Sequence, residues 1–212
     1  MGLLNDLGIK HHTDKSSPWH NYLDLYENHL APLKNKPITF WEIGVHTGNS
    51  IRMWDEYFVH SDTKLYGLDN VDRVELRPAR FNLFVGLQED RANLRKIVEQ
   101  VGLFDVIVDD GGHTMQQQQI SMGFLFPWVK PGGLYIIEDL HTSYNKRKMP
   151  RFNATGTKKT TLRMLQGLRD TGKINSDFIT AKEAAYIEEN VQKCSVEKGR
   201  EEICFIYKNS VK

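Results

Sequence analysis

The sequence predicts an α/β fold, with a mostly parallel sheet covered by helices on both faces and closed by an antiparallel hairpin. Its strand-like segments are apolar throughout rather than alternating, which is typical of parallel strands buried on both faces. They are interleaved with helical patterns, as in chains that build a parallel sheet. The end of the chain, 189–209, instead reads as two strands joined by a tight turn. Together these segments predict seven strands.

Each expected element has its own local signal. The five apolar runs are 38–43, 64–69, 81–85, 104–109 and 134–139. The first expected helix begins at Ser17 and Pro18, a good N-cap and first helical position, and carries an apolar stripe of Trp19, Tyr22, Leu23, Tyr26, Leu30 and Leu33. Further helices are expected after Asn49 or Ser50, after Asp90, over 113–125, over 162–168 and from a capping box of Thr180 with Glu183.

Length and composition favour a single domain over 1–212. The 212 residues are 40% hydrophobic and 26% charged, which is typical of one globular core. The net charge of +1 argues against long-range attraction to nucleic acid or membrane. No apolar run is long enough to span a bilayer, and the first fifteen residues lack the order of a signal peptide, so a cytoplasmic location is expected.

Two minor features have simple interpretations. Cys194 and Cys204 flank Gly199 symmetrically, so a hairpin turn would place them opposite each other. We expect two reduced, packed cysteines rather than a cross-strand disulfide. The glutamines of 116–119 are interpreted as the solvated face of a helix.

The stretch EIGVHTGNS, 42–50, lies where the first strand ends and the next helix begins. Ligands bind at this edge of open α/β sheets, and glycines let the backbone approach them. Gly44 and Gly48 are separated by three residues, so the G-x-G-x-x-G pattern of dinucleotide-binding proteins is absent. This absence argues against the NAD-dependent sugar dehydrogenase or epimerase that we consider as an alternative.

Two acids accompany this turn: Glu42 precedes Gly44, and Asp69 ends the next strand. The arrangement resembles the one with which class I methyltransferases hold S-adenosylmethionine, with Asp69 accepting from the ribose hydroxyls and Glu42 near the methionine amino group. The alternative is a tight turn that Glu42 merely caps. The cofactor-binding candidates are Glu42, Gly44, Gly48, Ser50 and Asp69.

Four carboxylates follow two strands that we expect to be neighbours. Asp109 and Asp110 end one, in FDVIVDDGGHT, and Glu138 and Asp139 end the other. Carboxylates gathered at one edge need raised pKa values, a basic partner or a cation, and a hard cation such as Mg²⁺ binds through oxygen ligands. Alternatively, Asp110 caps a helix and Asp139 accepts backbone hydrogen bonds. Asp109 remains open as a metal ligand, a cofactor contact or a structural acceptor.

His113 follows the glycines, close to the expected cation. Imidazole has an ordinary pKa near neutrality, which suits it to take a proton from a substrate hydroxyl. His113 is therefore the candidate general base.

Four segments together, EIGVHTGNSIRMW, FDVIVDDGGH, PGGLYIIEDLHTSY and TDKSSPWHNYLDLYE, resemble the metal-dependent sugar O-methyltransferases of the macrocin and mycinamicin type. The resemblance covers Thr13 to about Tyr144. It implies a Rossmann-like class I methyltransferase fold, S-adenosylmethionine as methyl donor, Mg²⁺ as cofactor and a hydroxyl of a deoxysugar such as rhamnose as acceptor. By motif match, Asp110, Glu138 and Asp139 would hold the metal and His113 would be the base. Leu87 stands where the family usually has an acid, so only Gln88 is carried over as a contact to adenine.

A basic segment follows the fifth expected strand, with eight lysines and arginines and no acid between 140 and 169. Its first part, 140–160, is either a solvated loop or a lid over an anionic acceptor such as a nucleotide-linked sugar. An RNA-directed methyltransferase is the further alternative, against which the balanced net charge argues. Tyr144, His141 and Tyr22 are candidate substrate contacts, and 1–37 is expected to be a helical substrate or lid segment. A homo-oligomer is left open.

Overall fold

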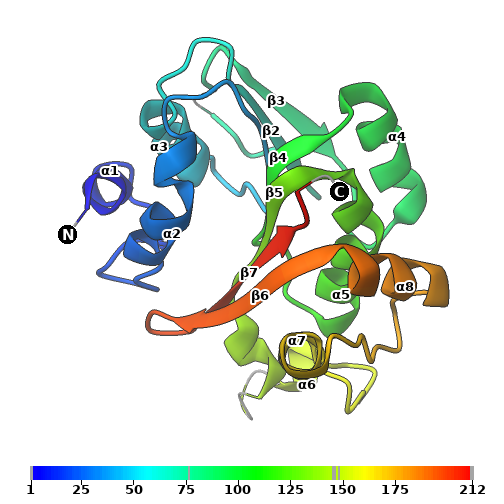
Figure 1. Ribbon diagram of the computed structural model, residues 1–212. Helices are drawn as coiled ribbons and strands as arrows, with labels where there is room; N and C mark the ends of the chain where they lie inside the picture. Colours follow the sequence, from blue (N-terminus) through cyan, green and yellow to red (C-terminus); the bar gives the residue numbers. More distant parts are fainter. Residues whose placement is uncertain (1, 76, 145–146, 148, 211–212) are drawn as a thin grey trace.

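The computed structural model describes residues 2–75, 77–144, 147 and 149–210. Its centre is a seven-stranded sheet in the order β3-β2-β1-β4-β5-β7-β6 (Figure 1). The strands are β1 (Thr39–Ile43), β2 (Lys64–Asp69), β3 (Phe81–Val85), β4 (Phe104–Asp109), β5 (Val129–Ile137), β6 (Val191–Lys198) and β7 (Glu202–Lys208). β1 to β5 pair in parallel, whereas β7 is antiparallel to both β5 and β6. The predicted fold class is confirmed.

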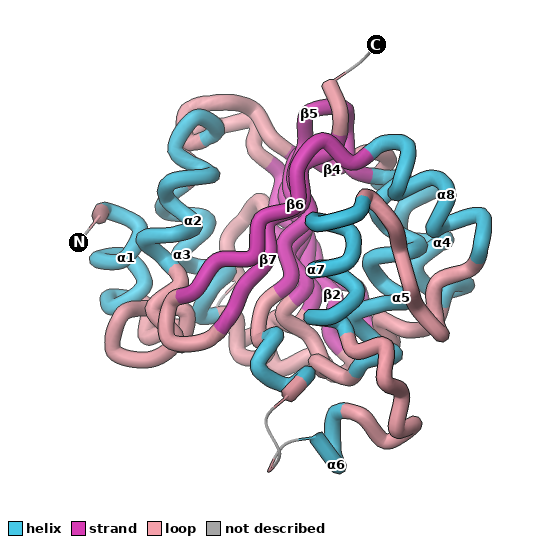
Figure 2. The backbone as a smooth tube through the Cα atoms, turned by 60° about the horizontal axis from the view of Figure 1, so that its bottom comes forward, coloured by secondary structure: helices cyan, strands magenta, loops and turns pink. Residues whose placement is uncertain are grey.

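Helices cover both faces of this sheet. Figure 2 shows α1, α2 and α3 on one side and α4, α5, α7 and α8 on the other. The helices are α1 (Leu3–Lys10), α2 (Leu23–Leu30), α3 (Asn49–Tyr57), α4 (Arg91–Val101), α5 (Met115–Leu125), α6 (Met149–Phe152), α7 (Thr161–Thr171) and α8 (Ala181–Asn190). Three short 3-10 turns are η1 (Ala31–Leu33), η2 (Phe126–Trp128) and η3 (Leu140–Ser143).

The core forms two layers, one on each side of the sheet. Val106 and Val108 of β4 pack in the layer of α1 to α3, while Ile107 packs in the layer of α4, α5 and α7. Successive side chains of a strand point to opposite faces, so a strand buried on both faces must be apolar at every position. This is why the parallel strands read as continuous apolar runs.

Several helix starts use the capping residues that the sequence predicts. Asp90 accepts from the backbone N–H groups of Ala92 and Asn93, and Thr180 forms a capping box with Glu183. The helix expected over 113–125 begins two residues later than predicted, because Thr114 is its N-cap. Asp110 therefore does not cap this helix and its carboxylate is left for the site.

The predicted N-terminal helix is wrong at its start. α2 begins at Leu23, and the residues before it form turns in which Trp19 is 63% exposed. The turns are held by distant partners, since the backbone N–H of Ser17 donates to Oδ1 of Asn5 at 2.8 Å. Asn21 adopts a left-handed backbone with φ of 57°, which interrupts the helix. The good cap at Ser17 and Pro18 is overridden by these contacts.

The interpretation of 116–119 as a solvated face is wrong for Gln118 and Gln119, whereas Gln116 is exposed. Gln118 and Gln119 are fully buried, and their side-chain amides donate to the carbonyls of Glu138 at 2.9 Å and Lys159 at 2.8 Å. α5 lies between the sheet and outer helices, so most of its surface is inside the protein. Buried amides are tolerated there because their hydrogen bonds are made.

The two cysteines are free and buried, as predicted, with their sulfurs 3.5 Å apart. They are not directly opposite, because Cys194 pairs with Ile206 and Cys204 pairs with Val196. No helix within the described part of the chain combines the length and apolar character that a membrane crossing requires.

Candidate active site

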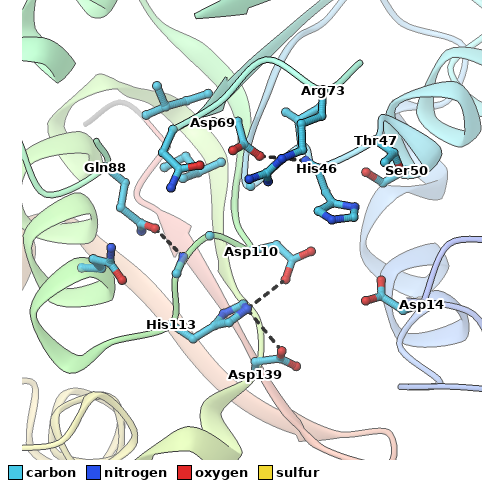
Figure 3. Close-up of a pocket in the computed structure, with 18 of the residues that line it drawn as sticks. Asp14, His46, Thr47, Ser50, Asp69, Arg73, Gln88, Asp110, His113 and Asp139 are labelled. Atoms are coloured by element: carbon cyan, nitrogen blue, oxygen red, sulfur yellow. Dashed lines mark hydrogen bonds and ion pairs between the residues drawn. The ribbon is translucent and has the colours of Figure 1, made fainter. Parts of the chain in front are cut away.

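A cavity of about 640 Å³ opens at the carboxyl ends of the parallel strands (Figure 3). Residues that follow β1, β2, β3, β4 and β5 all contribute to its wall, together with the N-terminal turn segment 12–15. Its volume is within the range of small-molecule sites. The location is the edge at which open α/β sheets bind ligands.

Gly44 brings the turn after β1 against the loop after β4. Its φ is 88°, and a Cβ at this position would lie 2.0 Å from the carbonyl oxygen of Asp110. No side chain fits there. Gly48, with φ of 83°, ends the same turn immediately before α3. Gly44 thus shapes the wall of the cavity between the two loops, whereas Gly48 lies next to Val74 and is not part of that wall.

Asp69 lines the cavity at the end of β2. Its Oδ2 accepts from the backbone N–H of His46 at 2.8 Å, which fixes the carboxylate (Figure 3). Gln88 also lines the cavity, and its Oε1 accepts from the backbone N–H of Gly112 at 2.7 Å. The structure therefore brings Gly44, Ser50, Asp69 and Gln88 to one cavity, as the cofactor prediction requires.

Two other candidate cofactor residues lie behind this wall. Glu42 is fully buried and its Oε2 accepts from the Ser50 hydroxyl at 2.7 Å. Asp109 is fully buried and accepts from Gln88, Ser121 and Tyr135. Both make internal hydrogen bonds, and their contact with a cofactor stays a prediction.

Asp110, His113 and Asp139 form a cluster at the other end of the cavity. Nε2 of His113 lies 3.9 Å from Oδ1 of Asp110 and 3.5 Å from Oδ2 of Asp139 (Figure 3). One ligand atom from each residue lies within 4.8 Å of the others, a geometry that could hold a metal ion. Two carboxylate oxygens suit Mg²⁺, whereas imidazole is a more usual ligand of transition metals. The oxygens of Asp110 and Asp139 would therefore suit the predicted cation, and His113 lies next to both carboxylates.

Backbone strain is concentrated around this cavity. Five non-glycine residues among those described have positive φ, and four of them, His12, His46, His113 and Asp139, line the cavity. Such conformations cost about 1 to 3 kcal/mol each and persist where the surrounding structure enforces them. The hydroxyl of Thr142 helps to hold these two residues in place, because the carbonyls of Asp139 at 2.9 Å and His113 at 3.3 Å both lie within hydrogen-bond distance of it. The fold thus positions both side chains at an energetic cost.

Lys15 lies among the carboxylates of Asp110, Glu138 and Glu42. The sequence did not predict it as a site residue. Its side chain is only 1% exposed. Nζ contacts Oδ2 of Asp110 directly, lies 2.8 Å from Oε1 of Glu138 and lies 3.3 Å from Oε1 of Glu42. Burial alone would lower the pKa of Lys15, but these three carboxylates raise it well above its usual value. The three carboxylates therefore favour the charged form of Lys15.

Glu138 faces this lysine rather than the cavity. Its Oε1 also accepts from the hydroxyl of Tyr26, and its side chain is 2% exposed. Burial raises the pKa of Glu138 to about 7, although Lys15 opposes the shift. Its role as a metal ligand stays a prediction, while Asp110 and Asp139 belong to the cluster around His113.

His113 is held as a neutral imidazole. Burial lowers its pKa to about 4, and nearby Asp139 only partly offsets this effect. Nδ1 of the ring is buried and has no hydrogen-bond partner among the residues that the structure describes. Nε2, which faces the carboxylates of Asp110 and Asp139, is therefore the ring atom placed to accept or donate a proton.

The candidate substrate residues lie beside Asp139. Tyr22 is fully buried and its hydroxyl donates to Oδ1 of Asp139 at 3.0 Å. His141 is 1% exposed, with Nδ1 3.9 Å from the same oxygen. Tyr144 is 48% exposed, and its hydroxyl donates to Glu202. Of the three, only Tyr144 presents a large free surface, and all three stay predictions as substrate contacts.

Comparison with known proteins identifies relatives of the whole arrangement. A tetracenomycin-C rhamnosyl 3'-O-methyltransferase of Streptomyces olivaceus is 34% identical over 176 residues, which is 80% of this chain and 45% of that protein. The mycinamicin VI 2''-O-methyltransferase of Micromonospora griseorubida is 35% identical over 66% of this chain and 37% of its own length. The solved structure of MycE methyltransferase with Mg, SAH and mycinamycin VI superposes with a TM-score of 0.79 at 28% identity, over 98% of this chain and 54% of that one. The chain belongs to this family of sugar O-methyltransferases.

This chain shares its fold with the family but corresponds to only part of the length of these relatives. The chain spans about half or less of the length of these sugar O-methyltransferases. No general family model matches it. The class I methyltransferase architecture, with its C-terminal antiparallel pair, is shared along almost the entire chain.

The sequence reasoning missed Lys15 and the buried glutamines. Lys15 stands within TDKSSPWHNYLDLYE, one of the segments that resemble the family. That shared segment was the available signal. A lone lysine in a polar stretch otherwise looks like a surface residue, since lysines are almost never fully buried unless paired.

Proposed function

We propose that this chain is the catalytic part of an S-adenosylmethionine-dependent, Mg²⁺-dependent O-methyltransferase that acts on a hydroxyl of a deoxysugar or glycoside. One observation carries the proposal: a single cavity joins Asp69 and the glycine turn at one end to Asp110, His113 and Asp139 at the other. The related enzymes named above are sugar O-methyltransferases, and the solved structure of MycE contains Mg and SAH.

The donor end of the cavity would hold the cofactor. Asp69 would accept from the two ribose hydroxyls, since a carboxylate is a bidentate acceptor and His46 already fixes its orientation. The turn from Gly44 to Gly48 would let the backbone approach the methionine part closely.

The acceptor end would position and deprotonate the sugar. Asp110 and Asp139 would hold Mg²⁺, which supplies a lowered pKa to a hydroxyl bound to it. His113 would take the proton at Nε2, and Asp139 at 3.5 Å would stabilise the resulting imidazolium. A positioned base typically contributes about 10² to 10⁴ in rate.

An anionic acceptor is supported by one basic residue of the segment after β5. Arg151 lines the cavity, and its guanidinium lies 5.2 Å from the ring centre of Phe152, which in turn packs edge-on against His113. Two other cations of the segment are paired, Lys159 with Asp177 and Arg169 with Asp170. The position of Arg151 favours a phosphorylated or nucleotide-linked sugar over RNA. Within the described part of the segment, a single cation lines the cavity, whereas RNA binding requires a basic surface.

Calorimetric titration with S-adenosylmethionine and with NAD⁺, each with and without Mg²⁺, tests the proposal. We expect S-adenosylmethionine to bind and NAD⁺ not to bind. Asp69→Asn should weaken S-adenosylmethionine binding by about 10-fold or more, because a hydrogen bond to a charged group contributes about 1.5 to 3 kcal/mol. The exposed Asp62, changed to Asn, is the matched control. Binding of NAD⁺ alone would reverse the conclusion.

A further inference from the structure

We propose that Lys15 is a positioning residue that makes the candidate metal site of Asp110, His113 and Asp139 prefer Mg²⁺ over Ca²⁺. It would do so by occupying one oxygen of Asp110, so that this carboxylate can offer only its other oxygen to an ion. The inference rests on the proposed function only in taking Asp110 as a ligand of a divalent cation.

The two oxygens of Asp110 have different partners. Oδ2 contacts Nζ of Lys15, while Oδ1 faces Nε2 of His113 at 3.9 Å. The contact with Lys15 therefore sets the orientation of the Asp110 carboxylate. Oδ1 is the oxygen that faces His113, on the side of the carboxylate that Lys15 does not contact (Figure 3).

Lys15 itself has little freedom to move. Nζ has three donor positions and three neighbouring carboxylates, those of Asp110, Glu138 and Glu42. Its backbone carbonyl accepts from the N–H of Tyr22 at 2.9 Å, and its side chain is 1% exposed. Release of Asp110 would leave charges unpaired inside the protein, which is strongly unfavourable. The clamp on Asp110 should persist when an ion binds.

The two ions differ in what they require from a carboxylate. Ca²⁺ takes 6 to 8 oxygen ligands, often with a carboxylate bound through both oxygens, whereas Mg²⁺ keeps a tight octahedron that includes several waters. A carboxylate restricted to one oxygen suits the smaller ion. A free Asp110 could turn and offer both oxygens to Ca²⁺.

The test measures the dissociation constants of Mg²⁺ and Ca²⁺ by calorimetry in the wild-type chain and in Lys15→Met. Both ions carry the same charge, so the loss of the lysine charge changes both affinities alike and cancels in their ratio. We expect the ratio of the Ca²⁺ to the Mg²⁺ dissociation constant to fall by about 10-fold, the lower end of what residues behind metal ligands contribute.

Lys208→Met is the matched control. Lys208 is a second buried lysine, and its Nζ donates to backbone carbonyls, those of Pro127 at 2.8 Å and Val129 at 2.7 Å. Its loss should leave the ion ratio unchanged. If Lys15→Met does not fold, Lys15→Met/Glu42→Gln removes one positive and one negative charge together, and the same lowered ratio is expected.

An unchanged ratio in either folded Lys15 variant would overturn the role of Lys15. If the wild-type chain binds S-adenosylmethionine and prefers Mg²⁺, that result leaves the proposed function standing. A wild-type chain that binds neither S-adenosylmethionine nor Mg²⁺ would instead contradict both proposals.

Discussion

The backbone N–H of Glu138 donates to the carbonyl of Asp109 at 3.0 Å, which joins the ends of β4 and β5 where both chains leave the sheet. The parallel register places Asp109 opposite Ile137, so the residues that follow each strand emerge side by side. Asp110 and Asp139 can therefore face the same His113. The acidic cluster is a direct consequence of strand register.

His113→Gln should lower kcat/KM for methyl transfer by about 10² to 10⁴, because the glutamine amide cannot accept a proton at neutral pH. Affinity for S-adenosylmethionine, measured by calorimetry, should remain close to that of the wild type. His60→Gln is the control, since His60 lies in the loop after α3 and accepts from the N–H of Asp62. Full activity in His113→Gln would show that another group takes the proton.

In metal-free protein, the contribution of His113 to stability should be lost as pH falls from about 6.5 to about 4, while the raised pKa of Glu138 acts in the opposite direction. The pKa of His113 is about 4 in the folded state against 6.5 ordinarily, so the unfolded chain binds a proton more readily within this window. The shift corresponds to about 3 kcal/mol. Urea unfolding at pH 7 and pH 4.5 with a chelator present measures the effect. The stability of the wild type should fall relative to that of His113→Gln over the same interval, and an unchanged difference between them would assign the pH dependence to other groups.

Gly44→Ala should destabilise the protein and weaken binding of S-adenosylmethionine. The added Cβ would lie 2.0 Å from the carbonyl oxygen of Asp110, so the β4–α5 loop must move. Gly102→Ala is the matched control, because Gly102 also has positive φ, of 93°, but has nothing within 4 Å of a Cβ. The control should lose about 1 to 3 kcal/mol from backbone strain alone. Thermal unfolding compares the two, and equal losses would mean that the close approach is unimportant.

Arg151→Ala should raise KM for an anionic sugar acceptor about 10-fold while changing kcat little. A hydrogen bond between charged groups contributes about 1.5 to 3 kcal/mol, and this one would act on binding. The effect should shrink with a neutral glycoside. Lys158→Ala serves as a control from the same segment, since Lys158 is not part of the cavity wall. An identical KM for both acceptors in Arg151→Ala would favour a neutral substrate.

Much of the fold follows from patterns that act locally. β2, β3 and β4 have the bounds predicted from their apolar runs, and the caps at Asp90 and Thr180 stand where the sequence places them. The order of acids and glycines after the strands was sufficient to indicate both ends of the cavity. These features depend on short segments whose side chains and backbone satisfy one another.

The errors occur where distant contacts override local preference. The turns around Trp19 replace a well-capped helix because Asn5 holds Ser17. The glutamines of α5 are buried because backbone carbonyls from other elements accept their amide hydrogens.

By itself, the sequence determined the α/β architecture and predicted that the strand-end acids and His113 gather at one edge of the sheet, because periodicity and strand direction place residues at a known edge. Only the tertiary structure decided how the carboxylates are used. It directed Glu138 and one oxygen of Asp110 to Lys15, and left the other oxygen of Asp110 and Asp139 to face His113. The physical reason is that the buried charge of Lys15 is stabilised by the carboxylates around it, and only the folded chain brings residues 15, 42, 110 and 138 together.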